Sequence, residues 1–284
     1  MIQNDYYSLR TQKEVVLTDA RYDGAQGAVL YPLCTNQIIR VNTEGAISQP
    51  TTNVVENGVC QSLVITDGES LSIEAGDFEA VSASYERNTS YTFGMLLLPC
   101  AVQSDDHVQF YQQVGLDDGY MAFRAVDNVP SNTPVLFKKR DAAASSVLIS
   151  GSGAVVNTTT SQGQTLTAPL WITGGCYAAS QLTDYEGIFY LSADKFWEAT
   201  GTVSVPAYRA VYRTKDANVK IRGFKFIDDT EAISLLPFPQ GEMEKSTMDT
   251  LSGQFVGSFS SPQGGREGAS SGIYLIQGKK WVVK

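Results

Sequence analysis

Residues 91–99 read Tyr-Thr-Phe-Gly-Met-Leu-Leu-Leu-Pro, and this stretch predicts a buried β-strand with a sharp end. The apolar part, residues 95–98, has the length of a strand rather than of a helix. Pro99 has no backbone N–H to donate, so a ladder of hydrogen bonds stops there. Residues 95–102 form the longest apolar run and contain this proline, so no segment has the length of a membrane-spanning helix.

Short apolar runs of the same kind recur along the chain. They are rich in β-branched and aromatic residues, and glycine- or aspartate-rich turn formers separate them. The sequence therefore predicts an all-β fold made of β-sandwich domains with few or no helices. The further strand-like runs are residues 135–137, 147–149, 188–191, 208–212 and 223–227, and the turn formers include Asp118-Gly119, Gly151-Ser152-Gly153 and Gly174-Gly175.

Three local patterns give more specific expectations. Residues 105–114 are predicted as one short helix, with Ser104 as its N-cap and acidic residues in its first turn. Residues 192–197 favour the turn of a β-hairpin over a helix. Residues 208–213, Tyr-Arg-Ala-Val-Tyr-Arg, alternate as a half-buried strand does, and Arg209 is expected to pair with a neighbouring carboxylate.

The charge and the cysteines exclude some kinds of partner. The formal net charge of −9 disfavours binding to nucleic acid, and the densest basic run, residues 138–140, is predicted as a solvated loop edge. The four cysteines lie far apart without a Cys-x-x-Cys motif, and three full disulfide pairings stay open. With His107 as the one histidine, neither zinc nor another cofactor is expected. Cys100 is predicted to be a small, buried apolar residue.

The segment Gly272–Lys284 predicts a terminal β-hairpin. Two short apolar runs, residues 273–276 and 281–283, flank Gln-Gly-Lys-Lys, which is typical hairpin-turn chemistry. The rest of the chain divides by composition into an N-terminal β segment, a β-rich body and a Pro/Gly linker. The expected boundaries are 1–60 for the N-terminal segment, 61–233 for the body, 234–246 for the linker and 247–284 for the C-terminal hairpin region.

A series of short motifs follows in order along residues 55–284. Together they resemble secreted or surface β-proteins of Bacteroidetes, in which this unit often follows a leucine-rich-repeat array of the surface-antigen type. The terminal segment is similar to C-terminal domains sorted by type IX secretion. The motifs are Asn57-Gly-Val-Cys, Ala83-Ser-Tyr-Glu-Arg, Tyr91 to Pro99, Val129-Pro-Ser-Asn-Thr-Pro-Val-Leu-Phe-Lys, Gly187-Ile-Phe-Tyr-Leu and Pro206-Ala-Tyr-Arg-Ala.

This resemblance implies an exported protein, extracellular or on the cell surface, and a β-sandwich fold. The N-terminal segment would then be the end of a truncated repeat array. Residues 1–7, Met-Ile-Gln-Asn-Asp-Tyr-Tyr, have no basic or apolar stretch of a signal peptide, which is typical of a cytosolic protein or of a mature or truncated piece. The resemblance favours the mature or truncated piece. The resemblance implies no catalytic residue.

The residues themselves indicate no catalytic or metal site. His107 lies in an acidic segment without a nucleophile motif, so it is predicted to be an exposed histidine. The acidic pairs sit among turn or linker residues and are read as solvated turn formers rather than as glycosidase or calcium residues. These pairs are Asp117-Asp118, Asp228-Asp229 and Glu242 with Glu244, and the aromatics considered for sugar stacking are Tyr6, Tyr7, Tyr177, Tyr185, Trp197 and Trp281.

The sequence therefore favours a non-catalytic, secreted or cell-surface module with a structural or adhesive role. The alternative is a carbohydrate-binding module, and an accessory domain of a glycoside hydrolase is a third reading. The expected partner is a host or bacterial surface glycan or protein, and no ligand-binding residue is assigned.

Overall fold

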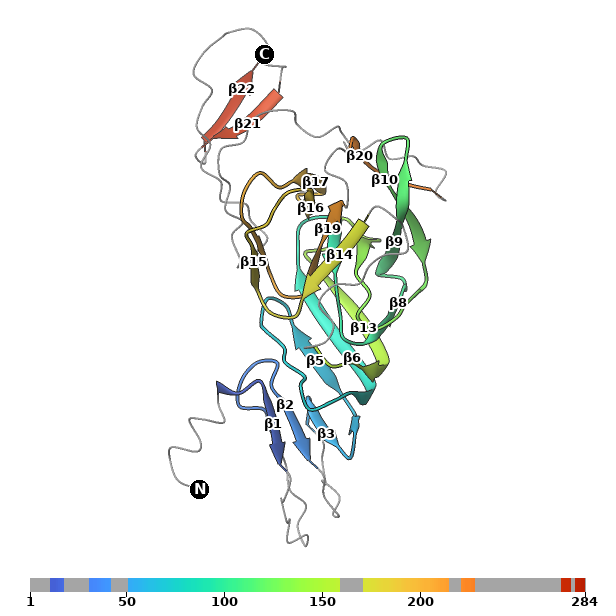
Figure 1. The fold of residues 1–284 in the computed structure, drawn as a ribbon, viewed down its shortest axis with the longest axis vertical. Helices are drawn as coiled ribbons and strands as arrows, with labels where there is room; N and C mark the ends of the chain where they lie inside the picture. The colour runs from blue at the N-terminus through green and yellow to red at the C-terminus, as the bar shows by residue number, and fades with distance from the viewer. Residues whose placement is uncertain are drawn as a thin grey trace, which may run out of the picture.

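The protein is described here from a computed structural model, which places residues 11–17, 31–41, 51–158, 171–214, 221–227, 272–276 and 279–283. Every element of these residues is a β-strand (Figure 1). The predicted all-β fold is therefore confirmed. None of the described segments contains a helix that is long and apolar enough to cross a membrane.

The N-terminal sheet is organised around two long antiparallel strands, β6 (Phe78–Asn88) and β13 (Ser146–Val155). The short strands β4 and β5 both run parallel to β6 along its other edge. Because β4 also pairs with β3, the hydrogen bonding of this sheet continues across residue 60, where the sequence predicted the boundary between the N-terminal segment and the body. Its other strands are β1 (Glu14–Leu17), β2 (Ile38–Val41), β3 (Val54–Glu56), β4 (Val59–Cys60), β5 (Leu63–Thr66), β8 (Ala101–Gln103) and β11 (Asn128–Val129).

The middle sheet has five strands and the third sheet has four. In spatial order the middle sheet is β20 (Gly223–Phe226), β10 (Tyr120–Val126), β9 (Val108–Asp117), β12 (Val135–Lys139) and β7 (Phe93–Leu96). The third sheet is β14 (Trp171–Cys176), β19 (Arg209–Thr214), β16 (Ile188–Ser192) and β17 (Lys195–Glu198), and β15 (Ser180–Leu182) pairs with β18 (Val203–Val205) beside it.

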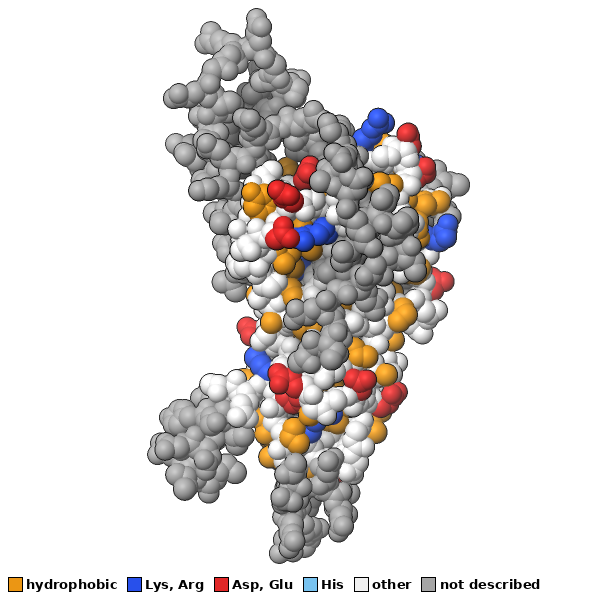
Figure 2. Space-filling model, viewed as in Figure 1, with side chains coloured by type: hydrophobic (Ala, Val, Ile, Leu, Met, Phe, Trp, Pro, Cys, Tyr) orange, Lys and Arg blue, Asp and Glu red, His pale blue; other side chains and the backbone are white. Residues whose placement is uncertain are grey.

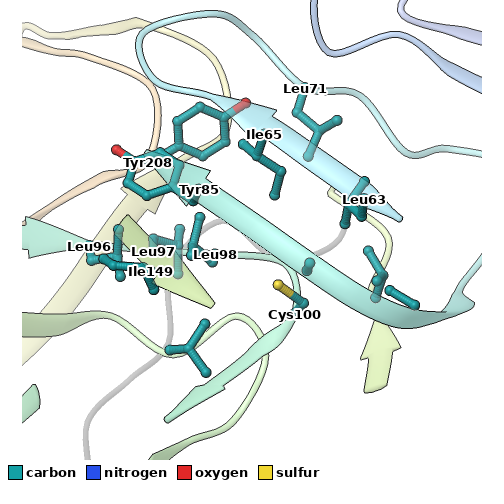
Figure 3. Packing of buried hydrophobic residues seen from close by; sticks show 14 of the residues in the cluster. Leu63, Ile65, Leu71, Tyr85, Leu96, Leu97, Leu98, Cys100, Ile149 and Tyr208 are labelled. Carbon is teal, nitrogen blue, oxygen red and sulfur yellow. The ribbon is translucent and has the colours of Figure 1, made fainter. Parts of the chain in front are cut away.

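The middle sheet is buried on both faces. On one face, Phe110 and Phe137 pack in a cluster with Tyr85 and Ile149 of the N-terminal sheet. Tyr85 also lies against Tyr208, with ring centroids 5.5 Å apart (Figure 3). On the opposite face, alternate residues of the same strands pack against the third sheet, as described next. Because successive side chains of each strand point to opposite faces, the middle sheet contributes to two cores, and the fold has three β layers.

The second core is a cluster of aromatic rings between the middle and third sheets. Phe123 of β10 is fully buried and lies at its centre. Its ring stacks on Phe196 at a centroid distance of 5.9 Å and meets Tyr212 edge-on at 5.8 Å. Such ring pairs add specificity to the burial of their large apolar area.

The predicted helix over residues 105–114 is wrong, because β9 occupies residues 108–117. The Asp105 carboxylate accepts hydrogen bonds from the backbone N–H groups of His107 (2.7 Å) and Val108 (2.9 Å). Ser104 Oγ accepts one from Phe110 N–H at 3.0 Å. These polar side chains close a turn that leads into a strand, which is the usual alternative to helix capping.

Two hairpin turns match the sequence prediction. Asp118 and Gly119 join β9 to β10 with φ angles of 50° and 78°, and Ala193 and Asp194 join β16 to β17 with φ angles of 51° and 59°. Positive φ at both central residues is the geometry that matches the right-handed twist of paired strands. The turn predicted within residues 192–197 is thus confirmed.

Two glycine pairs lie inside strands, although the sequence suggested turns there. Gly151 and Gly153 sit in β13, where its register against β6 shifts at a bulge. Gly175 sits in β14, and a Cβ on it would lie 2.5 Å from Leu97 Cδ2. These glycines permit a bulge and a close approach of two layers, which short-range turn rules do not reveal.

The terminal hairpin is confirmed at the level of the backbone. Strands β21 (Gly272–Ile276) and β22 (Lys279–Val283) pair antiparallel from Gly272 opposite Val283 to Ile276 opposite Lys279. The predicted linker, residues 234–246, lies outside the described residues.

The aromatic core gives a direct test of the three-layer packing. We expect Phe123→Ala to lower the free energy of unfolding by about 3–5 kcal/mol, because it removes a buried ring and leaves a cavity between two sheets. The matched control is Leu148→Ala on β13, whose side chain is 50% exposed. Urea denaturation should show almost no change for the control, and equal losses for both variants would contradict this packing.

Candidate functional site

The open edge of the middle sheet carries the charged residues of the candidate site. β7 pairs with β12 on one side only, so its other side presents backbone groups that need partners. The Asp194 carboxylate accepts hydrogen bonds from the N–H groups of Thr92 (3.0 Å) and Phe93 (2.7 Å). Arg87 Nη1 donates to the carbonyl of Met95 at 3.2 Å. Side chains from β6 and from the β16–β17 turn thus complete the edge.

A pocket of about 520 Å³ opens beside this edge, and we call it the Arg87 pocket. Its walls come from the β5–β6 loop, the end of β6, β7, the β16–β17 hairpin, β18 and the start of β19. Much of the lining is uncharged and polar. These side chains include Thr66, Asn88, Ser90, Ser145, Ser192 and Ser204.

The loop that forms one wall is fixed by a buried asparagine. Asn36 has a φ of 57° and is 3% exposed. Its side-chain amide donates to the carbonyls of Thr66 (3.0 Å) and Glu69 (2.8 Å), and its Oδ1 accepts from Thr66 N–H at 2.8 Å. The hydroxyl of Tyr208 lies 2.8 Å from the same amide nitrogen and shares its two hydrogens with these carbonyls, and that hydroxyl donates to the Glu69 carbonyl at 2.7 Å. The amide therefore holds both ends of the loop that presents Asp67.

Asp67 and Arg209 form a two-pronged ion pair at the base of the pocket. Arg209 Nη1 lies 2.7 Å from Asp67 Oδ1, and Nη2 lies 2.9 Å from Oδ2. Tyr85 donates its hydroxyl to Asp67 Oδ1 at 2.5 Å and accepts from Arg209 Nη1 at 2.9 Å. Burial by itself raises the pKa of Asp67, but hydrogen bonds from Arg209 and Tyr85 and the positive charges of Arg209 and Arg87 outweigh it and lower the pKa. The predicted pairing of Arg209 with a carboxylate is present.

Among the described residues, Arg87 has no paired carboxylate, although the charge of Asp67 acts on it. Its guanidinium lies over the Phe137 ring, 5.4 Å from the centroid, and its hydrogen bond to Met95 is its one hydrogen bond to a described residue. No described carboxylate forms an ion pair with it. Burial and the nearby positive charge of Arg209 lower the pKa of Arg87 to about 10, and this leaves Arg87 charged at neutral pH.

Of the residues considered for catalysis or calcium, those that the structure describes lie outside the Arg87 pocket. His107 is exposed and does not line the Arg87 pocket. Asp117 pairs with Lys225, and Asp118 forms the β9–β10 turn. Asp228, Asp229, Glu242 and Glu244 lie outside the described residues.

The candidate stacking aromatics whose side chains the structure describes do not form a platform. Tyr177 is buried, and its hydroxyl donates to Asn132 Oδ1 at 2.8 Å. Trp197 donates its indole N–H to the carbonyl of Ser192 at 3.1 Å. The exposed aromatic residues of the described chain are Tyr31 and Tyr185, and neither lines the Arg87 pocket. Tyr6 and Tyr7 lie outside the described residues, as does the side chain of Trp281.

The basic run at residues 138–140 is a strand end rather than a solvated loop edge. Lys139 belongs to β12 and is 2% exposed. Its ammonium group donates to the carbonyls of Thr89 (2.9 Å) and Ala144. On the face drawn in Figure 2, the Lys and Arg side chains lie in separate small groups without a continuous basic area.

The four cysteines are free thiols. Cys100 is 2% exposed, as predicted for a small apolar residue, and burial raises the pKa of its thiol to about 12. Such a thiol stays protonated and unreactive at neutral pH.

No family model, curated protein or solved structure matches this chain. The site therefore has to be interpreted from its own geometry. Sequence reasoning identified Arg209 but missed Asp67, Tyr85 and Arg87. One signal was available for Arg87: in β6, the inward positions Ala83 and Tyr85 continue to residue 87, where an arginine replaces an apolar residue.

The ion pair predicts a specific acid response. The lowered pKa of Asp67 stabilises the fold above the pKa of an unfolded aspartate, about 3.9, and that contribution is lost as the pH falls through the folded value. We expect Asp67→Asn to lower the free energy of unfolding by about 3 kcal/mol at pH 7, because it leaves the largely buried Arg209 without its counter-charge. The stability of this variant should also fall less steeply between pH 5 and 2.

Asp184→Asn is the matched control, since Asp184 pairs with Arg213 but its side chain is 77% exposed. Exposed pairs contribute little, so we expect a change below about 0.5 kcal/mol. Chemical denaturation at a series of pH values measures both variants, and indistinguishable curves would contradict the role assigned to Asp67.

Proposed function

We propose that the protein is a non-catalytic binding module with an adhesive role, and that the Arg87 pocket holds its partner. The observation that carries this proposal is a partly buried guanidinium that lines a pocket of about 520 Å³ and has most of its hydrogen-bond donors unused. A concave site with a few convergent polar groups is the usual form of a ligand-binding site.

The chemistry of the lining favours binding over catalysis. Neither His107 nor any of the four cysteines is among the described lining residues. Glu69 and Glu86 line the pocket, but both are exposed to solvent. The general acid of a glycosidase works in a site shielded from water, and these two side chains are open to solvent.

The carbohydrate-binding alternative has one observation in its favour. The pocket combines many hydroxyl and amide groups with two half-buried tyrosines, Tyr91 and Tyr190. Such groups suit the hydroxyls and apolar faces of a sugar. An accessory domain of a glycoside hydrolase would use the same pocket, and no separate observation favours it.

Blocking the pocket tests the binding role. We expect Ser204→Trp to abolish binding, because the indole would occupy the pocket from β18, whereas Ser150→Trp places the same ring on an exposed part of β13 outside the lining. The wild type and both variants would be compared on an array of neutral glycans, acidic glycans and extracellular-matrix proteins. Binding by the wild type and Ser150→Trp alone is the expected result, and an array without any bound ligand would overturn the proposal.

We also propose that the module works outside the inner membrane of a Bacteroidetes cell, with the terminal hairpin as an export signal. The support is the resemblance of Gly272–Lys284 and of the body motifs to exported proteins. Deleting Gly272–Lys284 should retain the protein inside the cell, as measured by protease access to intact cells. A Ser150→Trp protein serves as the exported control, and unchanged surface exposure of the deletion variant would refute the signal role.

A further inference from the structure

We propose that the partner held in the Arg87 pocket is an acidic saccharide, and that its carboxylate binds the guanidinium of Arg87. This inference rests on the binding role proposed above and adds the chemical class of the ligand. It is carried by the hydrogen-bonding geometry, the charge balance and the shape of the site.

The hydrogen-bonding geometry leaves most of Arg87 unused. An arginine carries five N–H donors, and one of them binds the Met95 carbonyl, so four have no acceptor among the described residues. The unused donors belong to a planar fork that matches the two oxygens of a carboxylate. Arg209 is more fully used, because its Nη1 donates to Asp67, Tyr85 and the Ala207 carbonyl and its Nη2 donates to Asp67.

The charge balance at the base of the pocket is positive. Among the described residues, the charges of Arg87 and Arg209 both act on one buried carboxylate there, that of Asp67. The other two carboxylates of the lining do not correct this balance: Glu69 is exposed and lies 3.9 Å from Lys13, and Glu86 points to the opposite face of β6 from Arg87. One ligand carboxylate would make the site neutral.

The guanidinium of Arg87 is also held in place before any ligand binds. The Phe137 ring lies under it, and this ring is fully buried. Gly94 leaves the space on the β7 side, where a Cβ would lie 2.8 Å from Arg87 Nη1. A donor fixed in this way loses little side-chain entropy on binding, which favours affinity.

The shape of the site favours a saccharide over a peptide. An extended peptide would bind by adding a strand to the edge of β7. That edge is already occupied, because Asp194 binds the N–H groups of Thr92 and Phe93, and Arg87 binds the Met95 carbonyl. The remaining walls offer the short hydroxyl and amide side chains that line the pocket, which suit sugar hydroxyls.

The experiment compares acidic saccharides with neutral counterparts by isothermal titration calorimetry. The probes are trigalacturonic acid and its methyl ester, sialyllactose and lactose, a hyaluronan tetrasaccharide and a hexaglutamate peptide. The proteins are the wild type, Arg87→Gln, Arg87→Lys and the control Arg213→Gln, whose arginine lies on β19 outside the pocket. Thermal unfolding of each variant checks that it is folded.

We expect at least one acidic saccharide to bind the wild type and Arg213→Gln, and to bind Arg87→Gln about tenfold more weakly or worse. Arg87→Lys should bind with intermediate affinity, because it keeps the charge but loses the planar fork. If Arg87→Gln does not fold, two comparisons still test whether Arg87 binds a carboxylate. They are the affinity of the wild type for trigalacturonic acid against its methyl ester, and the affinity of Arg87→Lys against the wild type.

Three results would overturn the inference. They are equal affinity for an acid and its neutral counterpart, unchanged affinity after Arg87→Gln, and tighter binding of hexaglutamate than of every acidic saccharide. If no acidic saccharide binds while the array still shows a ligand that Ser204→Trp abolishes, the acidic-saccharide inference fails and the binding role stands. An array without ligands removes the binding role itself.

Discussion

The edge of β7 sets the constraint on which the candidate site depends. The middle sheet is covered on both faces, so its edge strand runs through the interior of the protein rather than along its surface. Backbone N–H and C=O groups in such a place must find partners. A buried group without a hydrogen bond typically costs about 1–3 kcal/mol of stability, and the cost can reach several kcal/mol. Asp194 and Arg87 supply those partners from distant segments. Satisfying the edge therefore brings charged side chains into a partly buried place.

The same requirement organises the neighbouring wall. β5 is also an edge strand, and two asparagines in the left-handed region bind it as a further strand would. Asn53 accepts from Val64 N–H at 2.7 Å and donates to the Val64 carbonyl at 2.9 Å, and Asn36 makes the equivalent pair with Thr66. Asparagine tolerates this backbone conformation better than most residues. The N-terminal strands thus reach the pocket through two amides, which place the loop that carries Asp67.

The sequence predicts those features of the fold that local chemistry determines. Alternation and turn residues correctly place the β16–β17 hairpin and the terminal hairpin, and the burial of Cys100 follows from its apolar neighbours. The failures share one cause. Lys139 can be buried because two carbonyls of other loops accept hydrogen bonds from its ammonium group. Gly175 is needed because Leu97 approaches it from another layer. Contacts between residues far apart in the chain determine what these positions require. The periodicity of a single sequence reports local structure and does not reveal such contacts.

Arg87 provides more hydrogen-bonding capacity than the fold requires. The edge of β7 needs a single donor at the Met95 carbonyl, which an amide side chain could supply without bringing a charge inside. A second guanidinium beside Arg209 raises the energy of the folded protein, because two like charges share one carboxylate and both are partly desolvated. Stability alone would therefore favour an amide or an apolar residue at this inward position of β6. Binding of the proposed acidic ligand would remove that energetic cost, so the unfavourable charge in the free protein would add to the affinity for a carboxylate.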